Sequence, residues 1–303
     1  MKLINQIKNI SGKFNGKISF NEKLSKFSWF NIGGPAEVLF RPKNLRELSI
    51  FLKEIKGTKK IKVLGAGSNT LIRDGGFDGI IIKLGPSFSR ISLFDPTTLI
   101  AGASALDKKV SNFALKNSLA GFEFLSCIPG TIGGAIRMNS GCYEHDISKI
   151  LLSVQAIDFN GKVRIITRPN IEFFYRGSNL EEDLIFISAT FKGNKDSKIN
   201  IKNKINSFVE NKKVSQPSKI KTCGSTFKNP ANKKKAWELI KSSECSGLKV
   251  GGASISQKHN NFFLNNGNAS SSDIEDLIHK VKERVFKKTG TELELEIKII
   301  GEK

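Results

Sequence analysis

Hydrophobic residues recur at helical spacing in several stretches of the chain, with polar residues at the positions between them. The last stretch carries Ile274 and Leu277 on one face, and Gly290 follows it, as glycine often does just past a helix. Ser272 and Glu275 form a capping-box pattern at its start. The spacing predicts helices at 44–57, 104–121, 195–213, 233–241 and 272–288.

Short runs rich in isoleucine and leucine lie between these helices and predict strands. Asn160-Gly161 separates two of the runs, and this dipeptide is a strong signal for a β-hairpin turn. Near the C-terminus, apolar and charged residues alternate, which predicts a half-buried strand. The predicted strands are 61–64, 79–84, 90–94, 98–102, 151–159, 162–167, 184–192 and 291–300. This mixture of elements predicts an α+β fold.

The chain has 303 residues, which is enough for two or three domains. No window approaches the roughly 18 apolar residues of a membrane span, and the first residues lack the apolar core of a signal peptide. The four cysteines show no metal-binding spacing, and three histidines are few for a histidine-based site. These features predict a cytoplasmic protein with free thiols, no membrane span and no metal.

The formal net charge of +21 raises the question of nucleic-acid binding. Lysines outnumber arginines by 40 to 9 and are spread along the whole chain, whereas base recognition and bidentate phosphate contacts favour arginine. We therefore interpret the charge as a lysine-rich solvated surface that also attracts anionic small molecules. No specific nucleic-acid partner is predicted.

Two glycine-rich stretches, 65–70 and 126–141, each follow an apolar run. Positions without side chains let backbone N–H groups approach an anion closely. Either stretch alone is equally consistent with a structural turn, but the two together favour a cradle for a diphosphate. Neither is a Gly-x-Gly-x-x-Gly fingerprint or a P-loop, so the common nucleotide-binding folds are not indicated.

Three motifs, in the same order, make the chain similar to a known family. They are Phe30-Asn31-Ile32-Gly33-Gly34-Pro35-Ala36, Leu64-Gly65-Ala66-Gly67-Ser68-Asn69 and Ile128-Pro129-Gly130-Thr131-Ile132-Gly133-Gly134-Ala135. They resemble the flavin-binding motifs of the UDP-N-acetylenolpyruvoylglucosamine reductases, also called UDP-N-acetylmuramate dehydrogenases or the MurB family. The resemblance runs from about residue 30 to the C-terminus.

The resemblance implies a two-part FAD-binding domain of the vanillyl-alcohol-oxidase/p-cresol-methylhydroxylase type and a C-terminal α+β substrate domain. We expect the FAD-binding region at 1–195, with subdomains of about 1–85 and 86–195, and the substrate domain at 196–303. The resemblance also implies non-covalent FAD, with NADPH and a nucleotide sugar as substrates of a monomer. The expected FAD contacts are Gly65, Ala66, Gly67, Ser68, Asn69, Thr70, Ile128, Pro129, Gly130, Thr131, Gly133, Gly134 and Ala135.

Gly224-Ser225-Thr226-Phe227-Lys228-Asn229-Pro230 is the first candidate for the chemistry. From the residues alone, a serine in a proline-terminated loop usually bonds local backbone. The stretch resembles a family motif in which the serine donates a proton to substrate carbon and the asparagine contacts substrate. The resemblance therefore assigns these roles to Ser225 and Asn229. The family has glycine where this chain has Cys223.

Tyr175-Arg176 and Glu296 are also ambiguous by pattern, because such side chains commonly face solvent. The resemblance makes Arg176 an active-site cation and Tyr175 a substrate contact. The closing stretch, 293–301, resembles the family's last motif, in which the glutamate two residues before a basic residue is catalytic. That spacing selects Glu296 rather than Glu294.

The implied reaction reduces UDP-N-acetylglucosamine enolpyruvate to UDP-N-acetylmuramate in peptidoglycan precursor synthesis. Hydride would pass from N5 of the reduced flavin to the terminal enolpyruvyl carbon, and Ser225 would protonate the adjacent carbon. Arg176 and Glu296 would stabilise the enolate, with Glu296 protonated or acting through a hydrogen bond. Two alternatives stay open: another FAD-dependent oxidase or dehydrogenase of the same FAD-binding fold, and a basic nucleic-acid-binding protein.

Overall fold

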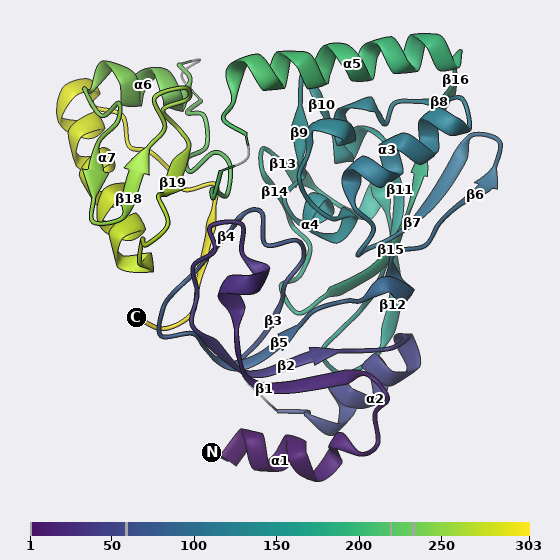
Figure 1. The fold of residues 1–303 in the computed structure, drawn as a ribbon. Helices are drawn as coiled ribbons and strands as arrows, with labels where there is room; N and C mark the ends of the chain where they lie inside the picture. Colours follow the sequence, from purple (N-terminus) through teal and green to yellow (C-terminus); the bar gives the residue numbers. More distant parts are fainter. Residues whose placement is uncertain (1, 58–59, 219, 232–233) are drawn as a thin grey trace. The chain divides into compact units, whose positions relative to one another are not determined.

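The chain folds into two compact units, each made from three separate segments (Figure 1). The computed structural model describes residues 2–57, 60–218, 220–231 and 234–303. Unit 1 comprises 1–20, 38–66 and 79–212, and unit 2 comprises 21–37, 67–78 and 213–303. The helices are α1 (Lys2–Ser11), α2 (Leu45–Glu54), α3 (Asp107–Lys116), α4 (Ile132–Arg137), α5 (Lys198–Ser215), α6 (Ala236–Ser242) and α7 (Ser271–Thr289).

The predicted helices are present, with some ends displaced. Helix α3 begins at Asp107 rather than at Ser104, because the Ser104 hydroxyl donates to the Gly85 carbonyl (2.8 Å) and caps no helix. Residue 233, at the start of the predicted helix 233–241, lies outside the described residues.

A five-stranded antiparallel sheet forms the centre of unit 1. Its order is β12-β11-β15-β7-β6, with β6 at Ile91–Asp95, β7 at Thr98–Gly102, β11 at Leu151–Ile157, β12 at Val163–Thr167 and β15 at Ile185–Lys192. The predicted hairpin around Asn160-Gly161 is confirmed by the pairing of β11 with β12. Its loop is longer than the predicted dipeptide, because Asp158 accepts hydrogen bonds from the N–H groups of Asn160 (3.0 Å) and Lys162 (2.9 Å). Helix α4 packs on β15 and β7 (Figure 1).

Another sheet has the order β1-β2-β5-β3, with β1 at Lys17–Lys23, β2 at Pro35–Arg41, β3 at Ile61–Val63 and β5 at Phe77–Ile82. In unit 1 its buried side chains pack with α2, and the rings of Phe40 and Phe51 stack with centroids 3.9 Å apart. Unit 1 also contains three two-stranded pairs: β8 (Leu119–Ala120) with β16 (Asn194–Lys195), β9 (Gly141–Cys142) with β10 (His145–Asp146), and β13 (Phe173–Phe174) with β14 (Gly177–Ser178).

Unit 2 packs α7 against a small antiparallel sheet and against α6. The sheet has the order β17-β18-β19, with β17 at Lys249–Val250, β18 at Ala253–Ile255 and β19 at Phe263–Asn265. Leu277 and Val281 of α7 are fully buried in its core. A parallel pair, β4 (Thr70–Ile72) with β20 (Lys298–Ile300), brings the C-terminal segment beside the residues that follow the first glycine-rich stretch.

Two predicted details of the C-terminal region are wrong. The capping box of α7 is formed by Ser270 and Asp273, not by Ser272 and Glu275. Glu275 instead pairs with Arg73, which donates to its two carboxylate oxygens at 2.8 and 2.9 Å. Gly290 does end α7 in the left-handed conformation, as predicted.

The predicted strand over 291–300 is confined to Lys298–Ile300. The alternation that suggested a longer strand is real in burial, since Leu293 and Ile297 are buried and Glu294 is exposed. These residues make only an isolated bridge, Phe227 with Leu295, before β20 begins. Alternating burial therefore extends further along the chain than regular strand pairing does.

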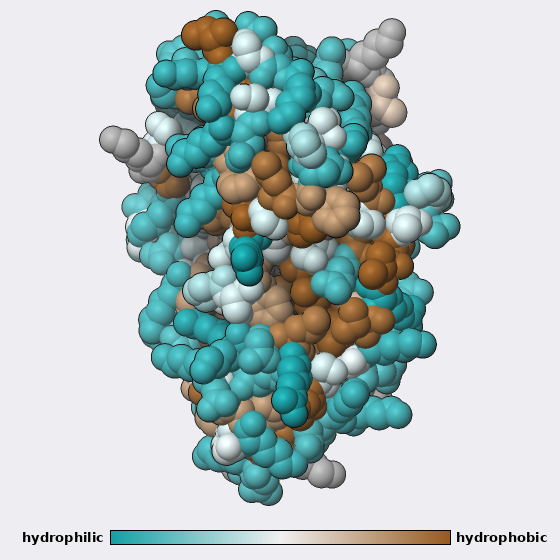
Figure 2. Space-filling model, turned by 90° about the vertical axis from the view of Figure 1, so that its right-hand side faces the viewer, coloured by the Kyte–Doolittle hydropathy of each residue, from teal (hydrophilic) through white to brown (hydrophobic). Residues whose placement is uncertain are grey.

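Most lysines lie at the surface of the part of the chain that the structure describes; none is fully buried there, and Lys83 is half-buried. Hydrophilic residues predominate on the face drawn in Figure 2, with hydrophobic residues between them. This distribution agrees with our interpretation of the +21 charge as solvated lysines. Among the described residues, no helix combines the length and hydropathy needed to span a membrane.

Candidate active site

The two glycine-rich stretches meet within unit 1. A Cβ atom added to Gly65 would lie 2.8 Å from Thr131 Oγ1, so the close contact favours glycine. The Lys83 ammonium donates to the Gly65 carbonyl, and burial, followed by the charge of Arg41, lowers the pKa of Lys83. A cationic side chain thus lies at the point where the two predicted FAD loops touch.

Backbone hydrogen bonds fix the stretch Ile128–Ala135 against the connection between β7 and α3. The Ile132 N–H donates to the Ala105 carbonyl (3.0 Å), and the Gly133 N–H donates to the Ala103 carbonyl (2.8 Å). These two N–H groups already donate to carbonyls of the protein and fix the loop in place. Its glycines therefore serve a ligand by lacking side chains, which lets the ligand approach the backbone closely.

Asp107 lies beneath this loop and is completely buried. Neither of its carboxyl oxygens has a hydrogen-bond partner among the described residues, and burial raises its pKa well above the ordinary value. Burial therefore favours the neutral form of the Asp107 carboxyl group. Its Oδ2 lies 2.7 Å from the position that a Cβ on Gly130 would take, so this glycine is needed for the loop to pack here.

The remainder of the first stretch, Gly67–Thr70, belongs to unit 2. Gly67 has a φ of 69°, and a Cβ there would lie 1.8 Å from the Phe27 carbonyl oxygen. Its own carbonyl accepts from the Trp29 N–H (3.0 Å). Asn69 donates through Nδ2 to the Glu296 carbonyl (3.1 Å), which connects this stretch directly to the C-terminal motif.

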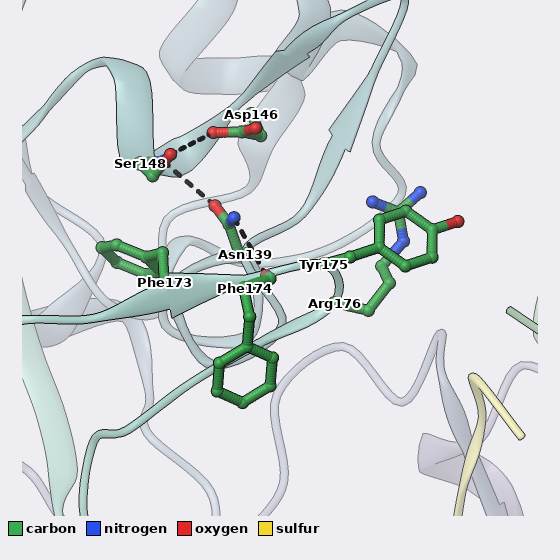
Figure 3. Close-up of a pocket in the computed structure, with 7 residues that line it drawn as sticks. All are labelled: Asn139, Asp146, Ser148, Phe173, Phe174, Tyr175 and Arg176. Carbon is green, nitrogen blue, oxygen red and sulfur yellow. Dashed lines mark hydrogen bonds between the residues drawn. The ribbon is translucent and has the colours of Figure 1, made fainter. Parts of the chain in front are cut away.

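A cavity of about 290 Å³ in unit 1 contains two of the predicted site residues (Figure 3). Tyr175 and Arg176 are the two residues between β13 and β14. Arg176 has a φ of 61°, a left-handed conformation that costs a non-glycine residue on the order of 1–3 kcal/mol and is found preferentially at functional sites. The cavity is lined by Asn139, Asp146, Ser148, Phe173, Phe174, Tyr175 and Arg176.

Two contacts place the Arg176 guanidinium. Its Cζ lies 4.8 Å from the centroid of the Tyr175 ring, and its Nη2 donates to the Gly141 carbonyl (3.3 Å). Asn139 supports the same hairpin, because its Nδ2 donates to the Phe174 carbonyl (3.3 Å) and its Oδ1 accepts from the Ser148 N–H (3.0 Å) (Figure 3). Asn139 was not among the predicted site residues, although an asparagine between two glycine-containing turns was available as a signal.

Ser225 and Glu296 lie on neighbouring backbone segments of unit 2. The Glu296 N–H donates to the Thr226 carbonyl (2.8 Å), and the Lys228 N–H donates to the Glu294 carbonyl (2.9 Å). On its other side, Ser225 bridges to Phe262. The Ser225 segment is therefore fixed between two others, and both Ser225 and Glu296 are half-buried.

The two candidate glutamates have different environments. Glu294 is 75% exposed and its Oε2 lies 3.2 Å from Lys228 Nζ, an ordinary surface ion pair. Glu296 is half-buried next to the Ser225 segment. This difference favours Glu296, as the family motif does.

Asn261 is the principal residue of this region that the sequence analysis did not single out. It is 3% exposed, its Nδ2 donates to the Phe227 carbonyl (2.8 Å), and its Oδ1 accepts from the Phe227 N–H (2.9 Å). Its own carbonyl accepts from the Thr226 N–H (2.8 Å). Its neighbours, Lys258-His259-Asn260-Asn261-Phe262, form a stretch that resembles the same family, and that resemblance was the signal that could have identified it.

Asn229 and His259 take part in local structure. Asn229 Oδ1 accepts from the Ala236 N–H (3.1 Å) at the start of α6. The His259 ring packs edge-on against Phe262 with centroids 4.7 Å apart, and burial lowers its pKa. The role of Asn229 as a substrate contact stays a prediction, and we assign no chemistry to His259.

The sequence of the first half of the chain defines the class of protein. Residues 36–167 match the family described as FAD binding domain. The residues present fit this cofactor, because the two glycine-rich stretches touch at Gly65 and Thr131 and the Lys83 cation lies at their contact. Burial also disfavours the charged form of the acid beneath, Asp107.

The remainder of the chain identifies the family. Residues 216–300 match the UDP-N-acetylenolpyruvoylglucosamine reductase, C-terminal domain. The chain is 51% identical over 299 residues to the UDP-N-acetylenolpyruvoylglucosamine reductase of Pelagibacter ubique (strain HTCC1062), covering 98% of this chain and 99% of that protein. It is 44% identical over 286 residues to the reductase of Rickettsia akari (strain Hartford), covering 94% and 96%. The chain belongs to the UDP-N-acetylenolpyruvoylglucosamine reductase family.

The fold is also that of a solved relative. The crystal structure of UDP-N-acetylenolpyruvylglucosamine reductase (MurB) from Thermus caldophilus matches with a TM-score of 0.81 at 28% identity, covering 95% of this chain and 99% of that one. The predicted fold class, a two-part FAD-binding domain with a C-terminal domain, and the predicted FAD cofactor are thereby confirmed.

Proposed function

We propose that this chain is an FAD-dependent oxidoreductase that reduces UDP-N-acetylglucosamine enolpyruvate to UDP-N-acetylmuramate, a peptidoglycan precursor, with NADPH as the electron donor. Membership of the family supports the reaction. The observation that carries the proposal is the pairing of the Ser225 and Glu296 segments in unit 2, where the Glu296 N–H donates to the Thr226 carbonyl at 2.8 Å. Two residues far apart in sequence, both assigned to the reaction by motif, are thus neighbours.

Bound FAD, once reduced, supplies the hydride, and the chain's own residues bind, orient and protonate. We assign the diphosphate to the loops at 65–70 and 128–135, where Lys83 contributes positive charge. Burial raises the pKa of Asp107 and so disfavours its charged form, which reduces its repulsion of an anion nearby. The proposed contacts are those assigned by motif: Gly65, Ala66, Gly67, Ser68, Asn69, Thr70, Ile128, Pro129, Gly130, Thr131, Gly133, Gly134 and Ala135.

Ser225 donates the proton to the substrate carbon next to the carboxylate in this proposal. Its segment is fixed on both sides by backbone pairing, so the hydroxyl can be positioned without large reorganisation. Such a hydroxyl needs no histidine base, because it gives up a proton to a developing carbanion rather than attacking substrate.

Arg176 provides the charge that stabilises the enolate, and Tyr175 and Asn229 contact the substrate. The left-handed backbone of Arg176 and its bond to the Gly141 carbonyl hold the guanidinium in one arrangement. A preorganised charge of this kind stabilises a transition state by a few kcal/mol, on the order of 3. Glu296 contributes either as a protonated acid or through a hydrogen bond, since an ionised carboxylate alone would repel the enolate.

The proposal includes a cytoplasmic, monomeric enzyme. Reducing conditions would keep its four free cysteines as thiols. The dispersed lysines would attract the anionic nucleotide sugar and NADPH without a sequence-specific nucleic-acid site.

The decisive test is NADPH oxidation by the purified yellow protein with and without the enolpyruvyl nucleotide sugar. We expect oxidation to depend on that substrate, and we expect acid precipitation to release the flavin into the supernatant. Oxidation that needs only oxygen, with flavin remaining in the protein pellet, would instead support an oxidase with covalently attached FAD.

A further inference from the structure

The segment 225–228 lies between two other segments of unit 2, and its two edges are paired in different ways. On one edge, the Glu296 N–H donates to the Thr226 carbonyl (2.8 Å). On the other edge the partner is Asn261, whose carbonyl accepts from the Thr226 N–H (2.8 Å). The position of Ser225 relative to the C-terminal motif therefore depends on both pairings.

The Asn261 side chain continues the second edge in place of a strand. Its Nδ2 donates to the Phe227 carbonyl (2.8 Å), and its Oδ1 accepts from the Phe227 N–H (2.9 Å). A side-chain amide carries the same donor and acceptor groups as a peptide, so it pairs with Phe227 as the opposite residue of an antiparallel strand would. The backbone pairing on this edge is an isolated bridge between Ser225 and Phe262. Asn261 thus makes three of the hydrogen bonds that fix the edge.

The amide pair is shielded from water. Asn261 is 3% exposed, and Thr226 and Phe227 are fully buried. The Phe227 ring packs edge-on against Phe263, with the ring centroids 5.8 Å apart. Water does not readily replace hydrogen bonds in such surroundings, so loss of the Asn261 amide leaves the backbone of Phe227 without a fixed partner.

The backbone that precedes Ser225 restrains it less. The Cys223 thiol donates to the Thr70 carbonyl (3.4 Å), but Gly224 lies between this anchor and Ser225. Gly224 has a φ of 78°, and a Cβ there would meet no atom outside its chain neighbours within 4 Å. Glycine has the widest backbone freedom of any residue. The hydrogen bonds that follow Ser225 are therefore the ones that fix its place.

We propose that Asn261 is a positioning residue for the Ser225 hydroxyl. Its side chain holds the backbone of Phe227, and this register sets Ser225 beside the Glu296 segment. Proton transfer requires the donor oxygen within hydrogen-bond reach of the accepting atom, and a misplacement of about 1 Å costs on the order of 10²-fold in rate. Asn261 acts through the backbone rather than on the substrate. The inference rests on the proposed role of Ser225 as the carbon acid.

The test measures the two half-reactions of the FAD-loaded protein separately, by stopped-flow absorbance. FAD content and far-UV circular dichroism are first matched to wild type. Asn261→Ala should be reoxidised by saturating enolpyruvyl nucleotide sugar at least about tenfold more slowly, while flavin reduction by NADPH stays within about twofold of wild type. A merely structural role would not separate the two steps in protein that is folded and loaded with FAD.

Asn261→Asp is the conservative variant, and Asn260→Ala is the control. The aspartic acid side chain has nearly the size of the amide, and in its protonated form it can make both bonds to Phe227. At mildly acidic pH, Asn261→Asp should therefore be reoxidised at least about fivefold faster than Asn261→Ala. Asn260→Ala, which loses a bond from a similarly buried amide to Ser246 Oγ (2.8 Å), should change neither step. Equally slow reoxidation of both Asn261 variants at that pH would contradict the proposal.

A double variant distinguishes this inference from the proposed function. If Asn261 acts through Ser225, the variant with both residues changed to alanine should be reoxidised within about twofold of the rate of Ser225→Ala. Additive slowing in the double variant, or wild-type reoxidation of Asn261→Ala beside a slow Ser225→Ala, would overturn the role of Asn261 alone. Wild-type reoxidation of Ser225→Ala would instead refute Ser225 as the acid, and the role of Asn261 with it.

Discussion

Replacing Ser225 by alanine separates the two halves of the proposed catalytic cycle. Reduction of the flavin by NADPH delivers no proton to a substrate carbon, so the hydroxyl is dispensable there. Reoxidation by the enolpyruvyl substrate needs that proton. The variant should therefore lose the second half-reaction and keep the first.

The structure sets the expected size of each effect. The contacts that fix this segment are backbone ones, namely the bridge from Ser225 to Phe262 and the 2.8 Å bond from the Glu296 N–H to the Thr226 carbonyl. Loss of Oγ leaves them intact, so stability should change by less than about 1 kcal/mol. Loss of a positioned acid should slow reoxidation by about 10²-fold or more, roughly 3 kcal/mol in activation free energy.

Stopped-flow absorbance measures both steps, after FAD content and thermal unfolding have been matched to wild type. Flavin bleaching by NADPH should stay within about a few-fold of wild type in Ser225→Ala. Ser225→Cys, which retains a proton donor, should recover part of the reoxidation rate. Ser254→Ala, which removes a hydroxyl that donates to Asn266 elsewhere in unit 2 (3.1 Å), should slow neither step. Equal slowing of both steps by Ser225→Ala, or of neither, would refute the assignment and favour Glu296 or a bound water as the acid.

Three further substitutions test other parts of the structure. Gly134→Ala should leave the free energy of unfolding unchanged, because the nearest atom to the new Cβ is 3.7 Å away. It should weaken FAD binding by about tenfold if that position faces the diphosphate. Unchanged FAD affinity in a fluorescence titration would exclude the contact. Asn261→Ala should lower the free energy of unfolding, measured in urea, by about 3 kcal/mol, because it leaves two buried backbone groups unpaired. The control Asn260→Ala, which loses one hydrogen bond to a side chain, should cost about 1 kcal/mol. Equal costs would contradict the role of Asn261 in pairing the Phe227 backbone. Glu275→Gln should cost about 2 kcal/mol at pH 7, because hydrogen bonding and charge from Arg73 lower the pKa of Glu275. The stabilisation is complete above the unfolded-state pKa and is lost as pH falls through the folded-state pKa, so the cost of the substitution should shrink over that range. A pH-independent cost would argue against the ion pair.

Local pattern was enough to predict most of the elements and the family. Helical spacing located α2 and α7, and Gly290 marked the end of α7, because periodicity and terminal glycines act within a few residues of each other. The glycine-rich stretches were recognisable for the same reason. A backbone that must pass close to other atoms cannot carry a Cβ, as the 2.8 Å approach at Gly65 shows.

Contacts between distant parts of the chain decided what local pattern could not. Glu275 matched a capping box by spacing, but its carboxylate pairs with Arg73, far away in sequence. The alternation near the C-terminus was correct in burial yet predicted too long a strand, because pairing with β4 extends only over Lys298–Ile300. The length of a paired strand depends on its partner strand, and the alternating segment alone does not predict how long that partner is.

In the candidate site too, local sequence predicted some residues, whereas contacts between distant segments determined their surroundings. Motifs identified Ser225 and Glu296, but only the folded chain shows that their backbone segments are neighbours. The fold also shows that Glu294 forms an ion pair with Lys228. Asn261 was not predicted because its importance lies in two hydrogen bonds to the backbone of one buried residue, Phe227. A polar residue in a loop carries no local sign of such a partner.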